Sequence, residues 1–149
     1  MPQSLSKLYT HLVFGTKYRK PLIKDNIRSD LHAYIAGLLY NLDCLPIKIN
    51  SVGDHIHILF ILSKNYSLAK VVEEVKKSSS KWMKDNGVSN FSWQRGYGAF
   101  SVSSSTVEIV ERYIENQQRH HRSKSFMDEL EEYMRGYGVL EYDRRYFWD

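Results

Sequence analysis

The chain has 149 residues, a length that fits one domain with one hydrophobic core. Hydrophobic residues make up 42% of it, which excludes a disordered chain, and its single cysteine excludes both a disulfide framework and a cysteine-based metal site within the chain. The net charge of +4 is compatible with a nucleic-acid partner. No apolar run approaches the ~20 residues of a membrane span, and the N-terminus lacks the apolar stretch of a signal peptide. We therefore expect a cytoplasmic protein without membrane association.

The first predicted elements are a strand and an amphipathic helix. Alternation over residues 5–18 predicts a strand covered on both faces, and Pro21 cannot continue it. Asp25 or Asn26 can cap the helix that follows, and its apolar residues recur at helical spacing. The strand faces carry Leu8, Thr10, Leu12 and Phe14 on one side and Tyr9, His11 and Val13 on the other. The helix stripe consists of Leu31, Tyr34, Ile35, Leu38, Leu39 and Leu42, with His32 outside it and expected to be exposed.

A histidine-bearing strand follows. Pro46 separates the helix from a second strand over residues 47–52, and Gly53 and Asp54 predict a hairpin turn into a third strand over residues 55–62. Because successive side chains of a strand point to opposite faces, His55 and His57 share one face. Two imidazoles at this spacing can both bind one metal ion, and they can equally be hydrogen-bonded structural histidines. Ile56, Ile58 and Phe60 on the opposite face predict a central strand packed on helices.

The next two elements are a helix and a short strand. Ser67 can cap the helix, which ends at Gly87. One of its faces is apolar, and the other is rich in lysine and serine, which suits both phosphate contacts and a plain solvated surface. A strand is predicted from Tyr97 or Gly98 to Val102.

The C-terminal part is predicted to be helical. Residues 105–108 have the spacing of a capping box, and the helix that they open runs towards His121. On it, Tyr113 and Gln117 lie four residues apart and therefore on one face. A phenol can attack a phosphodiester and a carboxamide can offer a metal a neutral oxygen, although a boundary tyrosine on an ordinary amphipathic helix gives the same pattern. Ser125 can cap a last helix that ends at Gly136, and residues 142–149 are predicted to be irregular.

The order of these elements predicts the fold class. Strand, helix, strand, strand, helix and strand form the split βαβ arrangement of an α+β, ferredoxin-like antiparallel sheet, with helices on one face and extra C-terminal helices. No linker or internal repeat divides residues 1–149, so one domain is expected.

Four segments, in this order, resemble the single-tyrosine HUH transposases of small insertion sequences. They are the opening strand at residues 10–21, the histidine strand at residues 53–59, the segment at residues 93–102 and the helix at residues 113–121. The resemblance covers nearly the whole chain. It identifies residues 1–149 as a single HUH transposase domain.

The resemblance implies a mechanism. His55, His57 and Gln117 would bind one divalent ion, Mg²⁺ or Mn²⁺, although two imidazoles and an amide by themselves would favour softer ions such as Zn²⁺ or Ni²⁺ as well as Mn²⁺. Tyr113 would attack single-stranded DNA that carries hairpin ends, giving a 5′-phosphotyrosine and a free 3′-OH, and strand transfer would reverse the step. The family works as a homodimer in which the helix carrying the tyrosine can complete the partner's active site.

Several assignments stay open at this stage. Basic residues expected to contact DNA are Lys17, Arg19, Lys20, Lys77, Lys81, Arg95 and Arg119. Tyr97, Tyr133 and Tyr137 are alternative nucleophiles, and His120 and His121 are alternative ligands, but only Tyr113 has a glutamine at the helical offset. The alternative function is a domesticated relative that binds or processes palindromic single-stranded DNA or RNA without transposition.

Overall fold

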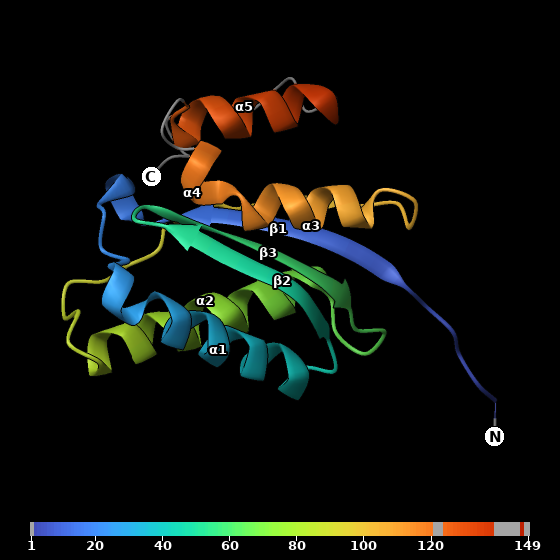
Figure 1. The fold of residues 1–149 in the computed structure, drawn as a ribbon. Helices are drawn as coiled ribbons and strands as arrows, with labels where there is room; N and C mark the ends of the chain where they lie inside the picture. Colours follow the sequence, from blue (N-terminus) through green and yellow to red (C-terminus); the bar gives the residue numbers. More distant parts are fainter. Residues whose placement is uncertain (1, 121–123, 139–146, 148–149) are drawn as a thin grey trace.

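The computed structural model describes residues 2–120, 124–138 and 147. The described residues form a four-stranded antiparallel sheet in the order β2-β3-β1-β4, which confirms the predicted ferredoxin-like α+β fold. Helices α1 and α2 cover one face of the sheet, and α3, α4 and α5 cover the other (Figure 1). The elements are β1 (Leu8–Gly15), the 3-10 helix η1 (Lys17–Arg19), α1 (Asp25–Asn41), β2 (Leu45–Val52), β3 (His55–Leu62), α2 (Leu68–Asp85), β4 (Gly98–Ser101), α3 (Val107–Glu115), α4 (Gln117–His120) and α5 (Phe126–Gly136).

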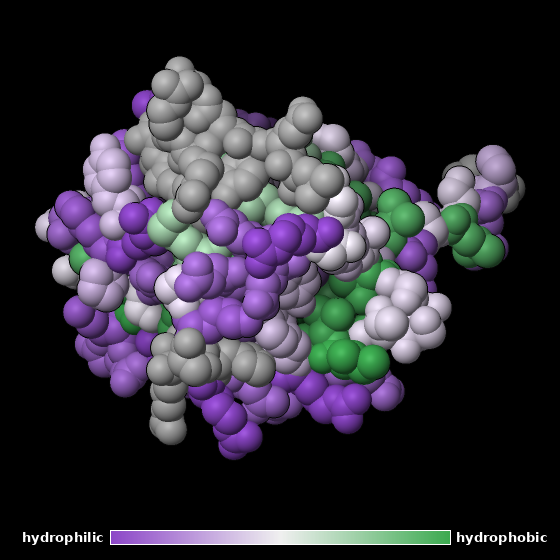
Figure 2. Space-filling view, turned by 90° about the horizontal axis from the view of Figure 1, so that it is seen from above, coloured by the Kyte–Doolittle hydropathy of each residue, from purple (hydrophilic) through white to green (hydrophobic). Residues whose placement is uncertain are grey.

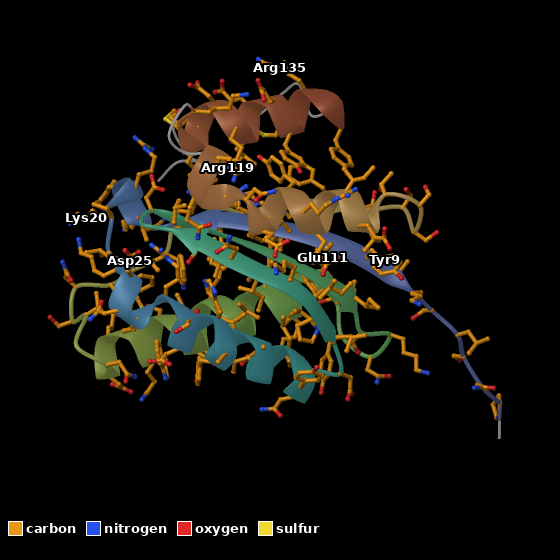
Figure 3. All side chains as sticks on the ribbon, viewed as in Figure 1. Tyr9, Lys20, Asp25, Glu111, Arg119 and Arg135 are labelled. Carbon is orange, nitrogen blue, oxygen red and sulfur yellow. The ribbon has the colours of Figure 1, made fainter. Side chains whose placement is uncertain are left out.

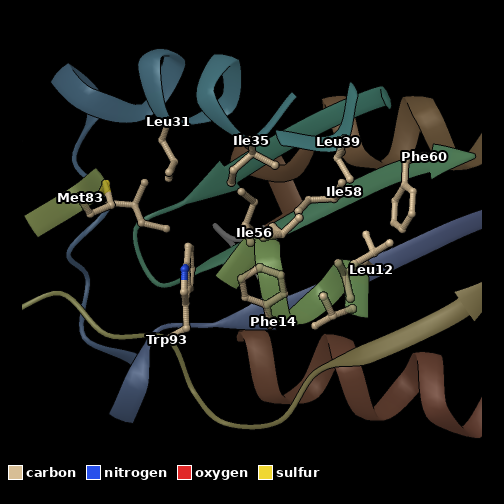
Figure 4. Close-up of a cluster of buried hydrophobic side chains, with 14 of the residues drawn as sticks. Leu12, Phe14, Leu31, Ile35, Leu39, Ile56, Ile58, Phe60, Met83 and Trp93 are labelled. Carbon is tan, nitrogen blue, oxygen red and sulfur yellow. The ribbon is translucent and has the colours of Figure 1, made fainter. Parts of the chain in front are cut away.

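The main core lies between the sheet and the layer of α1 and α2. Ile56, Ile58 and Phe60 of β3 are fully buried there, as the alternation of the strand predicts (Figure 4). Leu31, Ile35 and Leu39 of α1 pack against them. The second face of β3 is therefore free to carry polar side chains, because the apolar face alone fixes the register of the strand.

Two smaller apolar clusters hold the C-terminal helices on the second face. One joins Phe126, Leu130 and Met134 of α5 to Val13 and Phe100. The other joins Ile114 of α3 to Leu59 and Val102. These clusters bring α3 and α5 over the histidine side of β3.

The helix predicted from residue 107 towards residue 121 is interrupted at Asn116. An uninterrupted helix would use the carbonyls of Ile114 and Glu115 for its next turn. Both carbonyls instead accept from Asn50 Nδ2 on β2, at 2.8 and 3.2 Å. Gln118 also bonds to Asn50, since its Nε2 donates to Asn50 Oδ1 at 2.9 Å. The amide pair ends α3 at Glu115 and fixes the junction to the edge of the sheet.

Two predicted helix caps are wrong. The helix α1 begins at Asp25 with Lys24 as its N-cap residue and without a side-chain cap. Residues 105–108 do not form a capping box: the N-cap of α3 is Thr106, whose hydroxyl donates to the Ser103 carbonyl at 3.2 Å and so makes no cap bond to the helix. The predicted caps of α2 and α5 are confirmed, since Ser67 accepts from the backbone of Lys70 and Ser125 from that of Asp128.

The edge of the sheet at β2 also differs from the prediction. The strand starts at Leu45 and contains Pro46, which the sequence placed outside it. A register shift between Pro46 and Lys48, together with the edge position of β2, accommodates a residue without an N–H. His32 of α1 is half-buried rather than exposed, because its Nε2 lies 2.7 Å from the Ser51 hydroxyl of this strand. Burial, followed by the charge of Arg28, lowers the pKa of His32 to about 4.

Among the residues that the structure describes, no helix combines the length and apolar character that crossing a membrane requires.

Replacing Leu39 by alanine tests the core. Leu39 is fully buried, so Leu39→Ala should lower the free energy of unfolding by about 2–5 kcal/mol through lost burial and a residual cavity. Leu5→Ala is the matched control, since Leu5 is 85% exposed, and it should change the free energy by less than about 0.5 kcal/mol. Urea denaturation of both variants measures the difference, and equal losses would contradict the assigned core.

Candidate metal and tyrosine site

The second face of β3 presents two buried imidazoles to one carboxyl group. His55 and His57 are 0% and 1% exposed, and Glu129 of α5 is 4% exposed. His57 Nε2 lies 3.1 Å from Glu129 Oε1, and His55 Nε2 lies 3.6 Å from Glu129 Oε2. One ligand atom from each of the three residues lies within 4.8 Å of the other two. A buried His55-His57-Glu129 group of this geometry could hold a metal ion.

Tyr113 and Gln117 meet the same group, as their spacing predicts. The Tyr113 hydroxyl donates a hydrogen bond to Glu129 Oε1, and its ring lies 5.9 Å from that of His57, centroid to centroid. Gln117 Nε2 donates to Glu129 Oε1 at 3.1 Å. Gln117 Oε1 lies 3.4 Å from His55 Nε2, which leaves the carboxamide oxygen beside the imidazole. The phenol, the carboxamide and both imidazoles thus converge within one chain.

Sequence reasoning did not identify Glu129. The predicted last helix was judged by its apolar residues, among them Phe126 and Leu130. Glu129 lies between them on the same buried face of α5. A carboxyl group on the apolar stripe of an amphipathic helix is costly unless it is paired, and that was the signal available. What it pairs with could not be read from the spacing, because its partners come from β3 and α3.

Each imidazole makes a second contact through its Nδ1 atom. His55 Nδ1 lies 2.8 Å from Asp54 Oδ1, at the hairpin turn. His57 Nδ1 lies 2.8 Å from His11 Nε2 on the neighbouring strand β1. In each ring the Nε2 atom is therefore the one that faces Glu129.

Burial and neighbouring carboxyl groups set the ionisation of this cluster. Burial lowers the pKa of His55, but hydrogen bonds and charges from Asp54 and Glu129 outweigh it, so the pKa is raised above its usual value. Burial, followed by His57, lowers the pKa of His11 well below the usual value. Burial and then the hydrogen bond to Glu129 raise the pKa of Tyr113, so the phenol stays protonated.

Helix α5 covers the cluster. The Phe126 ring stacks on His55, with the two planes 5° apart and the centroids 4.1 Å apart. Gly15 allows this approach, since a Cβ at that position would lie 2.7 Å from the Phe126 ring. Seen from the side of α5, the surface outside the grey atoms combines hydrophilic areas with a hydrophobic patch on the right (Figure 2). The polar groups of the site are thus enclosed between the sheet and α5.

The basic residues expected to contact DNA divide between the two layers. Lys17, Arg19 and Lys20 lie in or beside η1, and the Lys17 backbone donates to the Ser92 carbonyl, which brings the loop that carries Arg95 alongside. Figure 3 places Lys20 and Arg119 towards the same end of the molecule.

The two lysines of α2 lie elsewhere. Lys77 and Lys81 are exposed on the layer opposite the histidine face, where they lie near Glu74 and Asp85 at 3.6 and 2.9 Å. The structure therefore does not bring them to the candidate site. Only the backbone of His120 is described, and His121 lies outside the described residues.

A family model described as "Transposase IS200 like" matches residues 4–117. The chain belongs to the IS200-like transposase family. A search of curated proteins finds no match.

Two solved structures share the fold. A candidate transposase from Deinococcus radiodurans R1 has a TM-score of 0.63 at 22% identity, covering 78% of this chain and 98% of that one. A REP-associated tyrosine transposase bound to a REP hairpin has a TM-score of 0.61 at 14% identity, covering 81% of this chain and 73% of that one. At these identities the likeness establishes the fold alone.

The titration of His55 tests the electrostatics of the site. In metal-free protein, Asp54→Asn should lower the pKa of the His55 ring, because the variant removes the charge that favours the imidazolium. A histidine whose pKa is raised on folding contributes its full stabilisation at pH values below its unfolded pKa of ~6.5. This stabilisation is lost as the pH rises through the pKa of the folded protein. The variant should therefore lose stability at low pH. Ring NMR titration measures the pKa.

The control for this experiment is Asp30→Asn, because Asp30 is an exposed residue of α1. An unchanged His55 titration in Asp54→Asn would assign the raised pKa to Glu129 alone.

Proposed function

We propose that this chain is a DNA transposase that cleaves and rejoins single-stranded DNA through Tyr113. The observation that carries the proposal is the convergence of a helix-borne phenol and two strand-borne imidazoles on one buried carboxyl group. Membership of the IS200-like transposase family supports it independently. The substrate would be single-stranded DNA with hairpin ends, in line with the hairpin bound by the REP-associated transposase of similar fold.

A divalent cation fits the donor set. His55 and His57 offer their Nε2 atoms, and Glu129 and Gln117 offer oxygens beside them. The carboxylate makes the set harder than two imidazoles and an amide and so better suited to Mg²⁺ or Mn²⁺, while two imidazoles with one carboxylate also bind Zn²⁺ or Fe²⁺. When bound, such an ion would polarise the scissile phosphate and stabilise the departing 3′ oxygen.

The protein's own groups account for the nucleophile. A phenol with a raised pKa is a poor nucleophile unless its proton leaves as the new bond forms. Glu129 Oε1 already accepts the Tyr113 hydroxyl and can take that proton. Tyr113 Oη would then bond to phosphorus as the bond from phosphorus to the 3′ oxygen breaks, and that oxygen would take a proton from water as it leaves. The phosphotyrosine keeps the phosphodiester bond for rejoining without an added energy source.

The buried position of the site requires a movement. His55 and Gln117 are 0% exposed, so a DNA phosphate cannot reach them in the conformation described. The element that separates them from solvent is α5, through Phe126 and Glu129. We infer that the Phe126 ring moves off His55 when DNA binds while Glu129 keeps its contacts with His57 and Tyr113, and that the described conformation is the closed one.

One chain supplies every group of the proposed site. Tyr113 lies beside His57 of the same chain, so each subunit of the expected homodimer would carry a complete site. Transfer of the tyrosine helix to a partner would first have to release the amide pair formed by Asn50 and Gln118.

Removing the phenol tests the nucleophile. Tyr113→Phe should retain binding of a labelled hairpin oligonucleotide and lose the covalent adduct, because only the attacking oxygen is removed. Tyr133→Phe is the matched control: its ring lies 5.6 Å from that of Tyr113, and its pKa is likewise raised by burial, yet it should keep the adduct. Denaturing gels show the adduct. An adduct that persists in Tyr113→Phe and disappears in Tyr133→Phe would transfer the role to Tyr133.

Mn²⁺ titration tests the ligand set. His57→Ala and Glu129→Ala should each weaken Mn²⁺ binding by more than the ~10–100-fold that losing a supporting residue causes, since each removes a donor atom. EDTA should abolish cleavage by the parent protein, and Mn²⁺ should restore it. Calorimetry measures the affinities.

The control variant is Glu132→Ala, on the exposed side of the same helix, which should bind Mn²⁺ like the parent. If Gln117→Ala loses Mn²⁺ while Glu129→Ala keeps it, the third ligand is the glutamine that the family resemblance implies, and Glu129 acts on Tyr113 alone.

A further inference from the structure

One buried histidine remains outside the proposed chemistry. His11 lies on β1 and is 0% exposed. Val13 is the residue paired with His57 across the sheet, so His11 is its diagonal neighbour on the same face. Its Nε2 lies 2.8 Å from His57 Nδ1, and the two rings are stacked with centroids 5.1 Å apart.

A single proton must lie between these two ring nitrogens. A neutral imidazole carries its proton on one nitrogen and a lone pair on the other. For His57 to bind a cation through Nε2, the atom that faces Glu129, its proton must be on Nδ1. His57 Nδ1–H then donates to His11 Nε2, and His11 carries its own proton on Nδ1.

His55 shows the same arrangement with a different partner. Its Nε2 also faces Glu129, and its Nδ1 is held by Asp54 at 2.8 Å. Metal-binding histidines commonly donate their second N–H to a fixed acceptor, which sets both the tautomer and the ring orientation. Asp54 is such an acceptor for His55, and His11 occupies the equivalent position for His57 without adding a charge to the buried site.

The surroundings of His11 suit an apolar residue better than a histidine. Tyr133 packs edge-on against the ring at 5.1 Å, and Phe100 lies 6.4 Å away. Among the described residues, Nδ1 has no hydrogen-bond partner. Burying an unpaired polar nitrogen costs about 1–3 kcal/mol, which an aromatic hydrocarbon at this position would avoid. The bond to His57 is the interaction that distinguishes a histidine here from a phenylalanine.

We propose that His11 is a positioning residue that accepts the Nδ1–H of His57 when a divalent cation is bound and so directs His57 Nε2 towards that cation. This inference rests on the proposed function, since it concerns the same metal site. His11 touches neither the cation nor the DNA and acts through His57 alone.

The test compares two substitutions of His11 in the full chain. His11→Phe keeps a flat ring and removes the acceptor, so Mn²⁺ affinity should fall by ~10–100-fold, as for other outer residues of metal sites. His11→Gln retains an acceptor oxygen and should recover most of the affinity. Thermal unfolding establishes that both variants fold. His11→Phe removes one unpartnered buried nitrogen and leaves His57 Nδ1 without its partner, so the two effects oppose each other and the unfolding temperature should stay close to that of the parent.

A second readout follows the tautomer of His57. In the metal-free parent, nitrogen-15 NMR should find the proton on Nε2, because Nε2 faces the Glu129 carboxylate, and adding the diamagnetic ion Mg²⁺ should move it to Nδ1. In His11→Phe this change should require ~10–100-fold more Mg²⁺. Unchanged Mn²⁺ affinity and an unchanged Mg²⁺ dependence of the tautomer in folded His11→Phe would overturn the inference.

His57→Ala separates this failure from that of the proposed function. If the parent binds Mn²⁺ and His57→Ala does not, the metal site stands and the comparison of the His11 variants decides the role of His11. If the parent binds Mn²⁺ no better than His57→Ala does, the proposed metal site and the role of His11 are both overturned.

Discussion

The structure depends on pairing a carboxyl group with two imidazoles in a place that water does not reach. Glu129 is 4% exposed, and an isolated charge at that depth would cost far more than the packing of α5 returns. Its oxygens are instead surrounded by His55, His57 and the Tyr113 hydroxyl. The same contacts place α5 over β3. Seating this helix and assembling the site are therefore one event.

One face of β3 stabilises the fold, and the other carries the histidines of the candidate site. Ile56, Ile58 and Phe60 fill the core against α1 and α2, which fixes the register of the strand. That register delivers His55 and His57 to the opposite face at a spacing that one ion can span. Because the core face holds the backbone rigidly, the imidazoles need only one further contact each to be oriented, from Asp54 and from His11.

The position of the tyrosine is controlled from the edge of the sheet. Asn50 Nδ2 donates hydrogen bonds to two carbonyls at the end of α3. Gln118 Nε2 donates to Asn50 Oδ1 and to the Ser51 carbonyl. This contact ends α3 at Glu115, two residues before Gln117, so that α4 leaves in a new direction. Tyr113 and Gln117 still face the same group although the break falls between them, since both side chains donate to Glu129 Oε1.

The sequence alone determined the alternation that makes β3 central, the ferredoxin-like order of elements, and the shared face of His55 and His57. Each follows from the period of a strand or a helix, which is a local property of the chain. It did not determine the break at Asn116, the half-buried position of His32, or the roles of Glu129 and His11. Glu129 was visible only as a carboxyl group on an apolar stripe, and His11 only as a histidine on a covered strand. What each of them contacts was decided by tertiary packing, because the imidazoles that they contact lie 46 or more residues away in sequence and are brought to them only when the sheet and α5 close on one another.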